Sequence, residues 1–220
     1  MSLTIYEFAH SPFCVPITQA LRAWKVPFET VEVPNHDRRR VIELTGGAYY
    51  QVPVLDHDGR LVFESGTDTQ DVAEYIDRTF CGGALFPARW AGWQRLLIPH
   101  LEDKVEAVGF RICDAHYIPA MEDVVARTMI VRHKERKFGR GCVDQWRRDE
   151  AALRQEATLL LTPFDEMLEH TPFLTGDRPI YSDFLLYGVL ANMTWLGRIE
   201  FPPLATLKAW HGRLREWRAN

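Results

Sequence analysis

The stretch that decides the fold is Phe8-Ala9-His10-Ser11-Pro12-Phe13-Cys14-Val15-Pro16. A strand-like apolar run precedes it at residues 3–6, and apolar residues with helical spacing follow it at Ile17, Leu21 and Trp24. This pattern predicts a turn from a strand into a helix. Such a turn places backbone N–H groups and the positive end of a helix dipole beside its side chains. Ser11 and Cys14 are therefore candidates for holding an anion.

The composition is that of a globular chain that can build one or two domains. The 220 residues are 46% hydrophobic and 25% charged, and the net charge of −4 comes from acids and bases mixed along the chain. No long single-sign block occurs, so we expect neither nucleic acid nor membrane as a partner. The longest apolar-rich run, Phe184 to Gly197, contains Asn192 and is too short to span a bilayer. No secretion signal is recognised, so we expect a cytoplasmic location.

The cysteines do not suggest a disulfide framework or a metal site. They lie far apart and none forms a C-x-x-C pair: Cys14, Cys81, Cys113 and Cys142. Zinc and dithiol sites use closely spaced cysteines. We therefore expect free, reduced thiols that fill small apolar spaces, and no metal.

Patterning in the first 80 residues predicts a small mixed sheet with helices packed on it, in the order β-α-β-α-β-β-α. After the first helix, we predict a strand at 28–33, a helix at 38–44, strands at 52–56 and 60–63, and a helix that ends near residue 80. The Asp58-Gly59 pair suits a tight hairpin turn between the last two strands. Pro53, near the start of a strand, must form an edge, a bulge or a cis turn.

The remainder of the chain has little β patterning and much helical spacing. Residues 81–87, Cys-Gly-Gly-Ala-Leu-Phe-Pro, have the composition of a linker. We therefore predict a domain at 1–80, a linker at 81–87 and an all-α domain at 88–220. The predicted helices are one opening at 90–97, and others at 121–131, 151–168, 185–196 and 204–217.

Four motifs, in order along nearly the whole chain, resemble the cytosolic glutathione transferase superfamily. They are Ser11-Pro12-Phe13-Cys14; Gln51-Val52-Pro53-Val54-Leu55; Asp68-Thr69 followed by Val72-Ala73-Glu74-Tyr75-Ile76-Asp77; and Phe173-Leu174-Thr175-Gly176-Asp177 with Tyr181-Ser182-Asp183-Phe184. The resemblance implies a thioredoxin-like α/β domain followed by an all-α bundle. It also implies glutathione as co-substrate, a homodimer and a role in detoxification, without specifying a subclass.

One position departs from the family pattern at the start of a helix. The family usually has Ser or Thr three residues before the buried Asp, where its side chain caps the helix. Here that position is Ile180, which cannot accept a hydrogen bond. Another residue must supply the cap, or the helix loses about 1 kcal/mol of stability.

The resemblance offers two registers for the γ-glutamyl end of glutathione. In the favoured register, a helix that starts near Thr69 offers its hydroxyl and free N–H groups to the carboxylate, while Asp68 faces the ammonium. Glu64-Ser65 is the alternative, because it also fits by its distance from Pro53. Helical spacing starts only after Gly66, which favours Asp68-Thr69.

The rest of the tripeptide is assigned by the same resemblance. The backbone of Val52, turned by a cis Pro53, would pair with the cysteinyl backbone of glutathione as an added strand does. Gln51 lies near the glycine end, where the family often has Lys, so a neutral hydrogen bond is expected there. Arg38, Arg39 and Arg40 could supply a positive charge, although a solvated helix face is the favoured interpretation for most of them.

Two residues of the turn compete for the chemical role. Ser11 could donate a hydrogen bond to the thiolate of glutathione, whereas Cys14 could itself be a nucleophile of low pKa. Ser11 occupies the place of the attacking cysteine in thioredoxin-like turns, so Cys14 is expected to be a packing residue. Phe13 lies between them and is a further candidate for the site. Tyr6, in the first strand, is a third candidate for activation but is expected in the core.

Residues of the all-α part are expected to line a pocket for a small apolar electrophile: Phe110, Cys113, Tyr117 and Trp195. An aromatic stripe at helical spacing can equally be core. The leading hypothesis is a serine-type glutathione transferase. The alternatives are a Cys14-dependent thiol transferase or glutathione lyase, and a non-catalytic binding module with the same fold. Conjugation, peroxide reduction, isomerisation, ether cleavage and dehalogenation all remain open.

Overall fold

The computed structural model describes residues 2–66 and 69–219. Its first part contains a four-stranded sheet in the order β2-β1-β3-β4. The elements are β1 (Leu3–Glu7), α1 (Cys14–Ala23), β2 (Glu29–Glu32), α2 (Arg39–Leu44), β3 (Val54–His57), β4 (Arg60–Val62) and α3 (Asp71–Ile76), which a π-helical turn η1 (Asp77–Cys81) extends. The predicted order β-α-β-α-β-β-α is confirmed.

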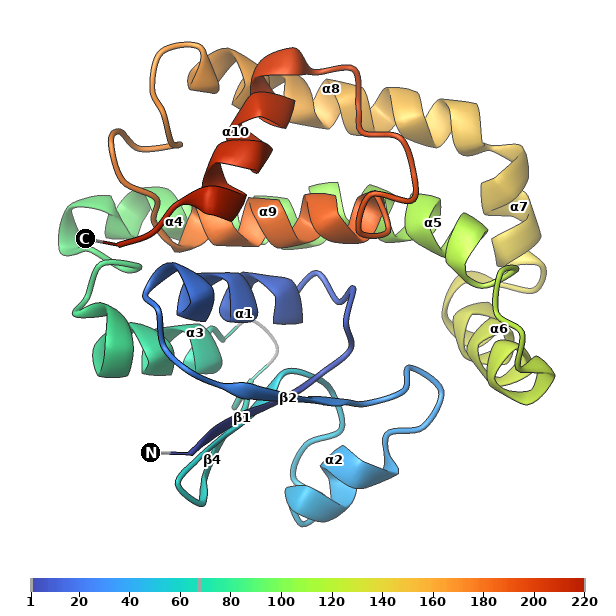
Figure 1. Ribbon diagram of the computed structural model, residues 1–220. Coiled ribbons are helices and arrows are strands. Elements are labelled where there is room, and N and C mark those ends of the chain that lie inside the picture. Colours follow the sequence, from blue (N-terminus) through green and yellow to red (C-terminus); the bar gives the residue numbers. More distant parts are fainter. Residues whose placement is uncertain (1, 67–68, 220) are drawn as a thin grey trace.

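The sheet is mixed, as the sequence predicts. β1 is parallel to β2 and antiparallel to β3, and β3 is antiparallel to β4. Ile5 lies at the centre, opposite Thr30 on one side and Leu55 on the other. Figure 1 shows α1 and α3 on one face of the sheet, between it and the later helices, and α2 on the opposite face. The turn from β1 into α1 therefore faces the second half of the chain.

The second half is helical. Its elements are η2 (Ala88–Trp90), α4 (Ala91–His100), η3 (Leu101–Val105), α5 (Glu106–Tyr117), α6 (Val124–Phe138), α7 (Cys142–Arg148), α8 (Glu150–Leu168), α9 (Tyr181–Met193) and α10 (Ala205–Glu216). The predicted helices match α4, α6, α8, α9 and α10, while α5 and α7 were not predicted. The pattern does not reveal α5 because Asp114 is buried and Glu106 is half-buried, so that two acidic residues interrupt the apolar stripe. α7 is too short, at 7 residues, for a clear period.

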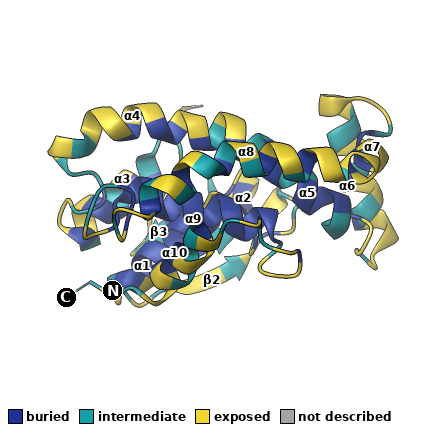
Figure 2. Cartoon of the chain, turned by 90° about the horizontal axis from the view of Figure 1, so that it is seen from above, coloured by how far each residue is buried: buried dark blue, intermediate teal, exposed yellow. Residues whose placement is uncertain are grey.

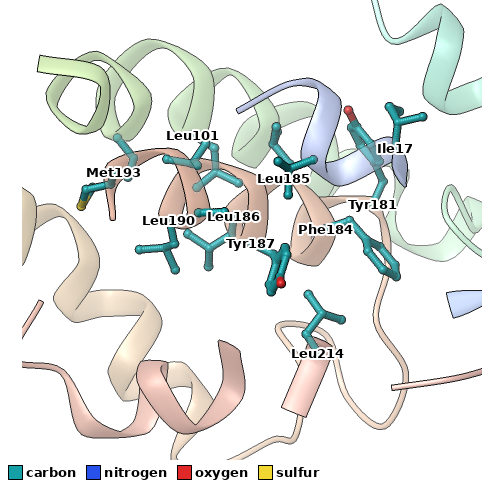
Figure 3. Packing of buried hydrophobic residues seen from close by; sticks show 14 of the residues in the cluster. Ile17, Leu101, Tyr181, Phe184, Leu185, Leu186, Tyr187, Leu190, Met193 and Leu214 are labelled. Atoms are coloured by element: carbon teal, nitrogen blue, oxygen red, sulfur yellow. The ribbon is translucent and has the colours of Figure 1, made fainter. Parts of the chain in front are cut away.

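The core is built around α9. Every residue from Tyr181 to Met193 is buried, and the helix packs against α1, α4, α5 and α10. Figure 2 shows it as a continuous buried segment, and Figure 3 shows its side chains in contact with Ile17 of α1, Leu101 of η3 and Leu214 of α10. A helix that is apolar all round must be buried on every side. α9 therefore connects the thioredoxin-like part to the helical part.

The start of α9 resolves the departure at Ile180. The Asp183 carboxylate accepts hydrogen bonds from the backbone N–H groups of Leu174 and Ile180 at 3.0 and 3.1 Å, and from Trp210 Nε1 at 3.2 Å. Gln94 Oε1, from α4, accepts from the backbone N–H and the hydroxyl of Ser182, both at 3.0 Å. Other residues thus satisfy the N–H groups that Ile180 cannot cap. Burial raises the pKa of Asp183 to about 7.

Candidate active site

Ser11 lies in the turn between β1 and α1 with its hydroxyl fixed by the backbone. Ser11 Oγ accepts hydrogen bonds from the N–H groups of Phe13 and Cys14 at 3.2 and 3.3 Å, and Ser11 N–H donates to the Phe8 carbonyl at 2.8 Å. The residue is 6% exposed. Because a serine oxygen has two lone pairs, two accepted bonds leave its proton as the group available to a further acceptor. The turn thus holds a hydrogen-bond donor in a fixed place.

Cys14 is enclosed by apolar side chains. It is 0% exposed and packs with Val33, Val41 and Val54. Burial raises the pKa of its thiol to about 12, although hydrogen bonds from the Ser11 side chain and the Phe8 backbone act in the opposite direction. At neutral pH the thiol is protonated, and burial therefore opposes a role as a nucleophile. Phe13, between the two residues, is 36% exposed.

An aromatic cluster adjoins this turn. We define it as Phe8, His10, Tyr117 and Trp195. The His10 ring lies 4.1 Å from Phe8 and 4.4 Å from Tyr117, measured between ring centroids, and Tyr117 lies 5.7 Å from Trp195. Burial, with a smaller contribution from Arg198, lowers the pKa of His10 to about 4, so the imidazole is neutral at physiological pH. His10 could not be identified as a site residue from the sequence, because its only signal is its position beside Ser11.

The predicted pocket residues on α5 have different surroundings. Tyr117 belongs to the aromatic cluster. Phe110 packs on Phe138 and Trp146 at centroid distances of 5.3 and 5.6 Å. Cys113 is 0% exposed, and burial raises the pKa of its thiol. Because the Cys113 side chain is fully buried, it presents no surface to a ligand.

Trp195 is held in the cluster by a strained turn after α9. Trp195 and Leu196 have φ angles of 44° and 54°, in the left-handed region that side chains with a Cβ rarely adopt. Such positions cost about 1–3 kcal/mol each and persist where their surroundings enforce them. The Arg198 guanidinium lies 4.8 Å from the centre of the Trp195 ring. This turn fixes one wall beside the Ser11 turn.

The Val52-Pro53 peptide bond is cis, one of the three forms that the sequence allowed. It lies at the start of β3, beside β1. Val52 is 8% exposed, whereas Gln51 is exposed and donates to Tyr50 Oη at 3.2 Å. Tyr6, in β1, is half-buried against the small apolar cluster around Cys14, as expected for a core position.

The two registers for the γ-glutamyl end meet at the start of α3. Glu64 Oε2 accepts hydrogen bonds from Thr69 Oγ1 at 2.8 Å and from the Asp71 N–H at 2.7 Å. The N–H and hydroxyl of Ser65 donate to Asp71 Oδ2 at 2.7 and 2.6 Å. α3 begins at Asp71, two residues after the predicted start, because Glu64 caps its first N–H groups. Asp68 lies outside the described residues.

Of the three arginines at 38–40, Arg38 is half-buried. Its Nη2 donates to Asn35 Oδ1 at 2.8 Å, while Nη1 is buried and has no hydrogen-bond partner within residues 2–66 and 69–219. Burial lowers the pKa of the guanidinium, against the opposing influence of Cys14 and Glu32. Arg39 and Arg40 are exposed, as expected of a solvated helix face.

Other features lie away from the Ser11 turn. A cavity of about 690 Å³ is lined by His116, Asp144, Arg147, Arg148 and Glu150, on α5, α7 and α8, together with small apolar residues.

In the part of the chain that is described, no three His, Cys, Asp or Glu side chains are grouped as a metal site requires. None of the described helices is both long and apolar enough to cross a bilayer.

Comparison with known proteins agrees with this geometry. Residues 5–83 match the family model described as glutathione S-transferase, N-terminal domain. A probable glutathione S-transferase of Nicotiana tabacum is 25% identical over 197 residues, 88% of this chain and 70% of the relative. Another, of Oryza sativa subsp. japonica, is 28% identical over 214 residues, 93% and 80% of the two chains.

Solved structures share the fold over almost the whole chain. The glutathione transferase GSTFuA2 of Phanerochaete chrysosporium has a TM-score of 0.79 at 16% identity, covering 100% of this chain and 99% of that one. A glutathione S-transferase of Ceriporiopsis subvermispora in complex with glutathione has a TM-score of 0.77 at 18% identity, covering 97% and 96%. Glutaredoxin 2 of Salmonella typhimurium in complex with glutathione has a TM-score of 0.74 at 21% identity, covering 98% and 95%.

Proposed function

We propose that the chain is a member of the cytosolic glutathione transferase superfamily, and that it transfers glutathione to a small apolar electrophile with Ser11 as the residue that activates the thiol. The match of residues 5–83 to the glutathione S-transferase N-terminal family model and the similarity to plant glutathione S-transferases support this proposal. The observation that carries the proposal is the fixed Ser11 hydroxyl, whose oxygen accepts hydrogen bonds from the Phe13 and Cys14 N–H groups. Its proton, which can also point to the Cys14 sulfur, would be donated to the thiolate of glutathione. We include a role in detoxification in the proposal, because the resemblance to this superfamily implies it.

The chemistry requires the thiol of bound glutathione to ionise. A free thiol has a pKa of about 8.5, so only a few per cent is thiolate at neutral pH. A hydrogen bond to a charged sulfur contributes roughly 1.5–3 kcal/mol, which lowers that pKa by about one to two units. The dipole of α1 adds a smaller contribution. The thiol would release its proton to solvent, and Ser11 would donate a hydrogen bond to the resulting thiolate. The sulfur would then form a bond to the electrophilic carbon. In a substitution the leaving group departs with its bonding pair, and in an addition the atom next to that carbon takes up a proton from solvent.

The tripeptide would bind across the ends of β3 and α3. The Val52 backbone, beside the cis Pro53, would pair with the cysteinyl residue. Thr69, with Glu64 and Ser65 beside it, would receive the γ-glutamyl group. The buried Nη1 of Arg38 suits the glycine carboxylate, because an unpaired guanidinium nitrogen gains a charge-assisted hydrogen bond there. Gln51 would add a neutral hydrogen bond at the same end.

The electrophile would lie against the aromatic cluster. Tyr117 and Trp195 keep part of their rings exposed, and His10 is neutral, so the wall beside Ser11 is apolar. An apolar wall binds apolar electrophiles by removing their surface from water.

We further propose a homodimer. On α4, Trp93 is 37% and Leu96 is 75% exposed. Apolar side chains of this size on a helix surface favour burial against a second chain. Analytical ultracentrifugation should give twice the mass of one chain, and a Leu96→Glu variant should shift the protein toward the monomer.

The alternatives fit the observations less well. A Cys14-dependent thiol transferase or lyase needs an accessible thiolate, whereas Cys14 is 0% exposed and burial raises its pKa to about 12. A non-catalytic module would bind glutathione without turnover.

The deciding experiment is a panel of glutathione-dependent reactions on three proteins. The wild type should conjugate a small aromatic electrophile, Ser11→Ala should lose roughly ten- to hundredfold in kcat/KM, and Cys14→Ala should stay near the wild type. Loss of activity in Cys14→Ala alone would favour the thiol transferase. Absence of glutathione binding at millimolar concentration would exclude both enzymes.

A further inference from the structure

α9 touches the Ser11 turn at two points that lie one helical turn apart. Asn192 Nδ2 donates a hydrogen bond to the His10 carbonyl at 2.8 Å, in the residue directly before Ser11. Four residues earlier, Gly188 allows a close approach: a Cβ there would lie 2.6 Å from the Pro12 carbonyl oxygen and 2.5 Å from the Pro16 ring. Residues four apart share one face of a helix. This face of α9 therefore contacts the chain on both sides of Ser11.

We propose that Asn192 is a positioning residue that holds Ser11 at the distance required for its hydrogen bond to the glutathione thiolate. The inference rests on the proposed function, since it assigns a role through Ser11. Asn192 itself would contact neither glutathione nor the electrophile. It acts by fixing the peptide group that joins His10 to Ser11.

The surroundings of Asn192 argue for a directed role. The residue is 6% exposed, on a helix whose other side chains are mostly apolar. Its Oδ1 is buried and has no hydrogen-bond partner within the described residues, 2–66 and 69–219. A half-satisfied buried amide is unfavourable for packing alone, and an apolar residue of the same shape would avoid that cost. The compensating feature is the single bond to the His10 carbonyl.

Small displacements of this turn matter because the hydrogen bond of Ser11 is directional. Donor–acceptor bonds weaken steeply as they bend and lengthen, and active groups act only when held within about half an ångström of their place. The other contacts of the Ser11 hydroxyl, with Phe13 N–H and Cys14 N–H, belong to the same turn. They move with it and cannot fix it to the rest of the molecule. The hydrogen bond from Asn192 can fix the turn, because it comes from another element, α9.

The chain offers a matched control in α1, which packs on α9. Gln19, in α1, is 4% exposed and donates through Nε2 to the carbonyls of Leu214 and Arg215 at 3.1 and 3.0 Å. Like Asn192, it is a buried amide that bonds backbone carbonyls between the two parts of the molecule. It lies two turns of α1 beyond the Ser11 turn. Loss of its amide should lower stability without changing the position of Ser11.

The test is a double-mutant cycle read by the pKa of the thiol of bound glutathione, obtained from thiolate absorbance against pH. Asn192→Leu should raise that pKa by about half a unit or more, since the whole hydrogen bond is worth about one to two units. In the Ser11→Ala background the same change should have no effect, because Asn192 acts through Ser11. Gln19→Leu should leave the pKa unchanged in both backgrounds.

The outcomes separate this inference from the proposed function. If Ser11→Ala leaves the pKa of the bound thiol unchanged, the proposed function fails and the inference fails with it. If Ser11→Ala raises the pKa but Asn192→Leu does not, or does so equally in both backgrounds, the inference alone is overturned. Should Asn192→Leu not fold, as judged by circular dichroism, Asn192→Ala replaces it under the same criteria.

Discussion

The Ser11 turn and the segment from Glu64 to Asp71 would hold opposite ends of glutathione, and they are held in different ways. The Ser11 turn is buried and is gripped by α9 through Asn192 and Gly188. The described residues of the segment bond mainly to one another, as Glu64 with Thr69 and Ser65 with Asp71, and Ser65 is exposed. The thiol end is therefore built into the core, whereas the γ-glutamyl end depends on local contacts.

This difference predicts that changes in the Ser11 turn affect stability or chemistry strongly, and changes in the segment affect mainly the binding of glutathione. The following changes test that division, in order of decreasing effect.

The largest effect should be the loss of stability at acid pH that the buried His10 causes. Its pKa is lowered to about 4, from 6.5, by burial and then by Arg198. Between these values the unfolded chain binds more protons, so stability falls as the pH falls from 6.5 to 4. Relative to His10→Phe, the wild type should lose on the order of 3 kcal/mol of unfolding free energy between neutral pH and the acid limit. Urea unfolding at several pH values measures this. A difference independent of pH would contradict the buried, neutral imidazole.

Gly188→Ala should have the next largest effect. The new Cβ would enter the space of the Pro12 carbonyl oxygen and the Pro16 ring. Overpacking of this kind costs about 1–3 kcal/mol and should also displace the turn. Urea unfolding measures the loss. Gly212→Ala, on α10, is the control, since a Cβ there meets nothing within 4 Å. Equal stability of the two variants would show that α9 does not grip the turn.

Glu64→Ala should cost less. The carboxylate accepts from the Asp71 and Val72 N–H groups at the start of α3, and caps of this kind contribute about 1 kcal/mol. The variant should be less stable by that amount, as measured by thermal unfolding, and should bind glutathione less tightly. A fall in kcat with unchanged KM would be inconsistent with a role at the binding end.

The smallest effect should distinguish the two registers. Loss of one neutral hydrogen bond to glutathione weakens binding by about 0.5–1.5 kcal/mol, a factor of roughly two to ten. Thr69→Val should raise the KM for glutathione by that factor, and Ser65→Ala should raise it less. Steady-state kinetics with glutathione varied decide the matter. The reverse order would assign the γ-glutamyl group to Glu64-Ser65.

Much of the fold could be predicted from the sequence because its periods are clear. Alternating strands and the Asp58-Gly59 turn gave the order of the first part, and long apolar stripes gave α8 and α10. α5 could not be found in this way, since the buried Asp114 and the half-buried Glu106 interrupt its apolar stripe. Asp114 pairs with Lys134 at 2.7 Å, a contact between α5 and α6 that no local pattern reveals.

The candidate site was predictable only where local chemistry defines it. Ser11 and the cis Pro53 are signalled by their immediate neighbours. The contribution of Asn192 is not, because in the sequence it only interrupts an apolar run, and its bond to His10 joins residues 182 positions apart. Residues that position a site from a distance become visible only in the folded molecule.

The central claim is that Ser11 activates the thiol of another molecule. Its most direct test is the pKa of the glutathione thiol when bound to the wild type, to Ser11→Ala and to Cys14→Ala. We expect a pKa about one to two units below the free value of roughly 8.5 in the wild type and in Cys14→Ala, and a return toward the free value in Ser11→Ala. An unchanged pKa in Ser11→Ala, or a rise in Cys14→Ala alone, would contradict the account.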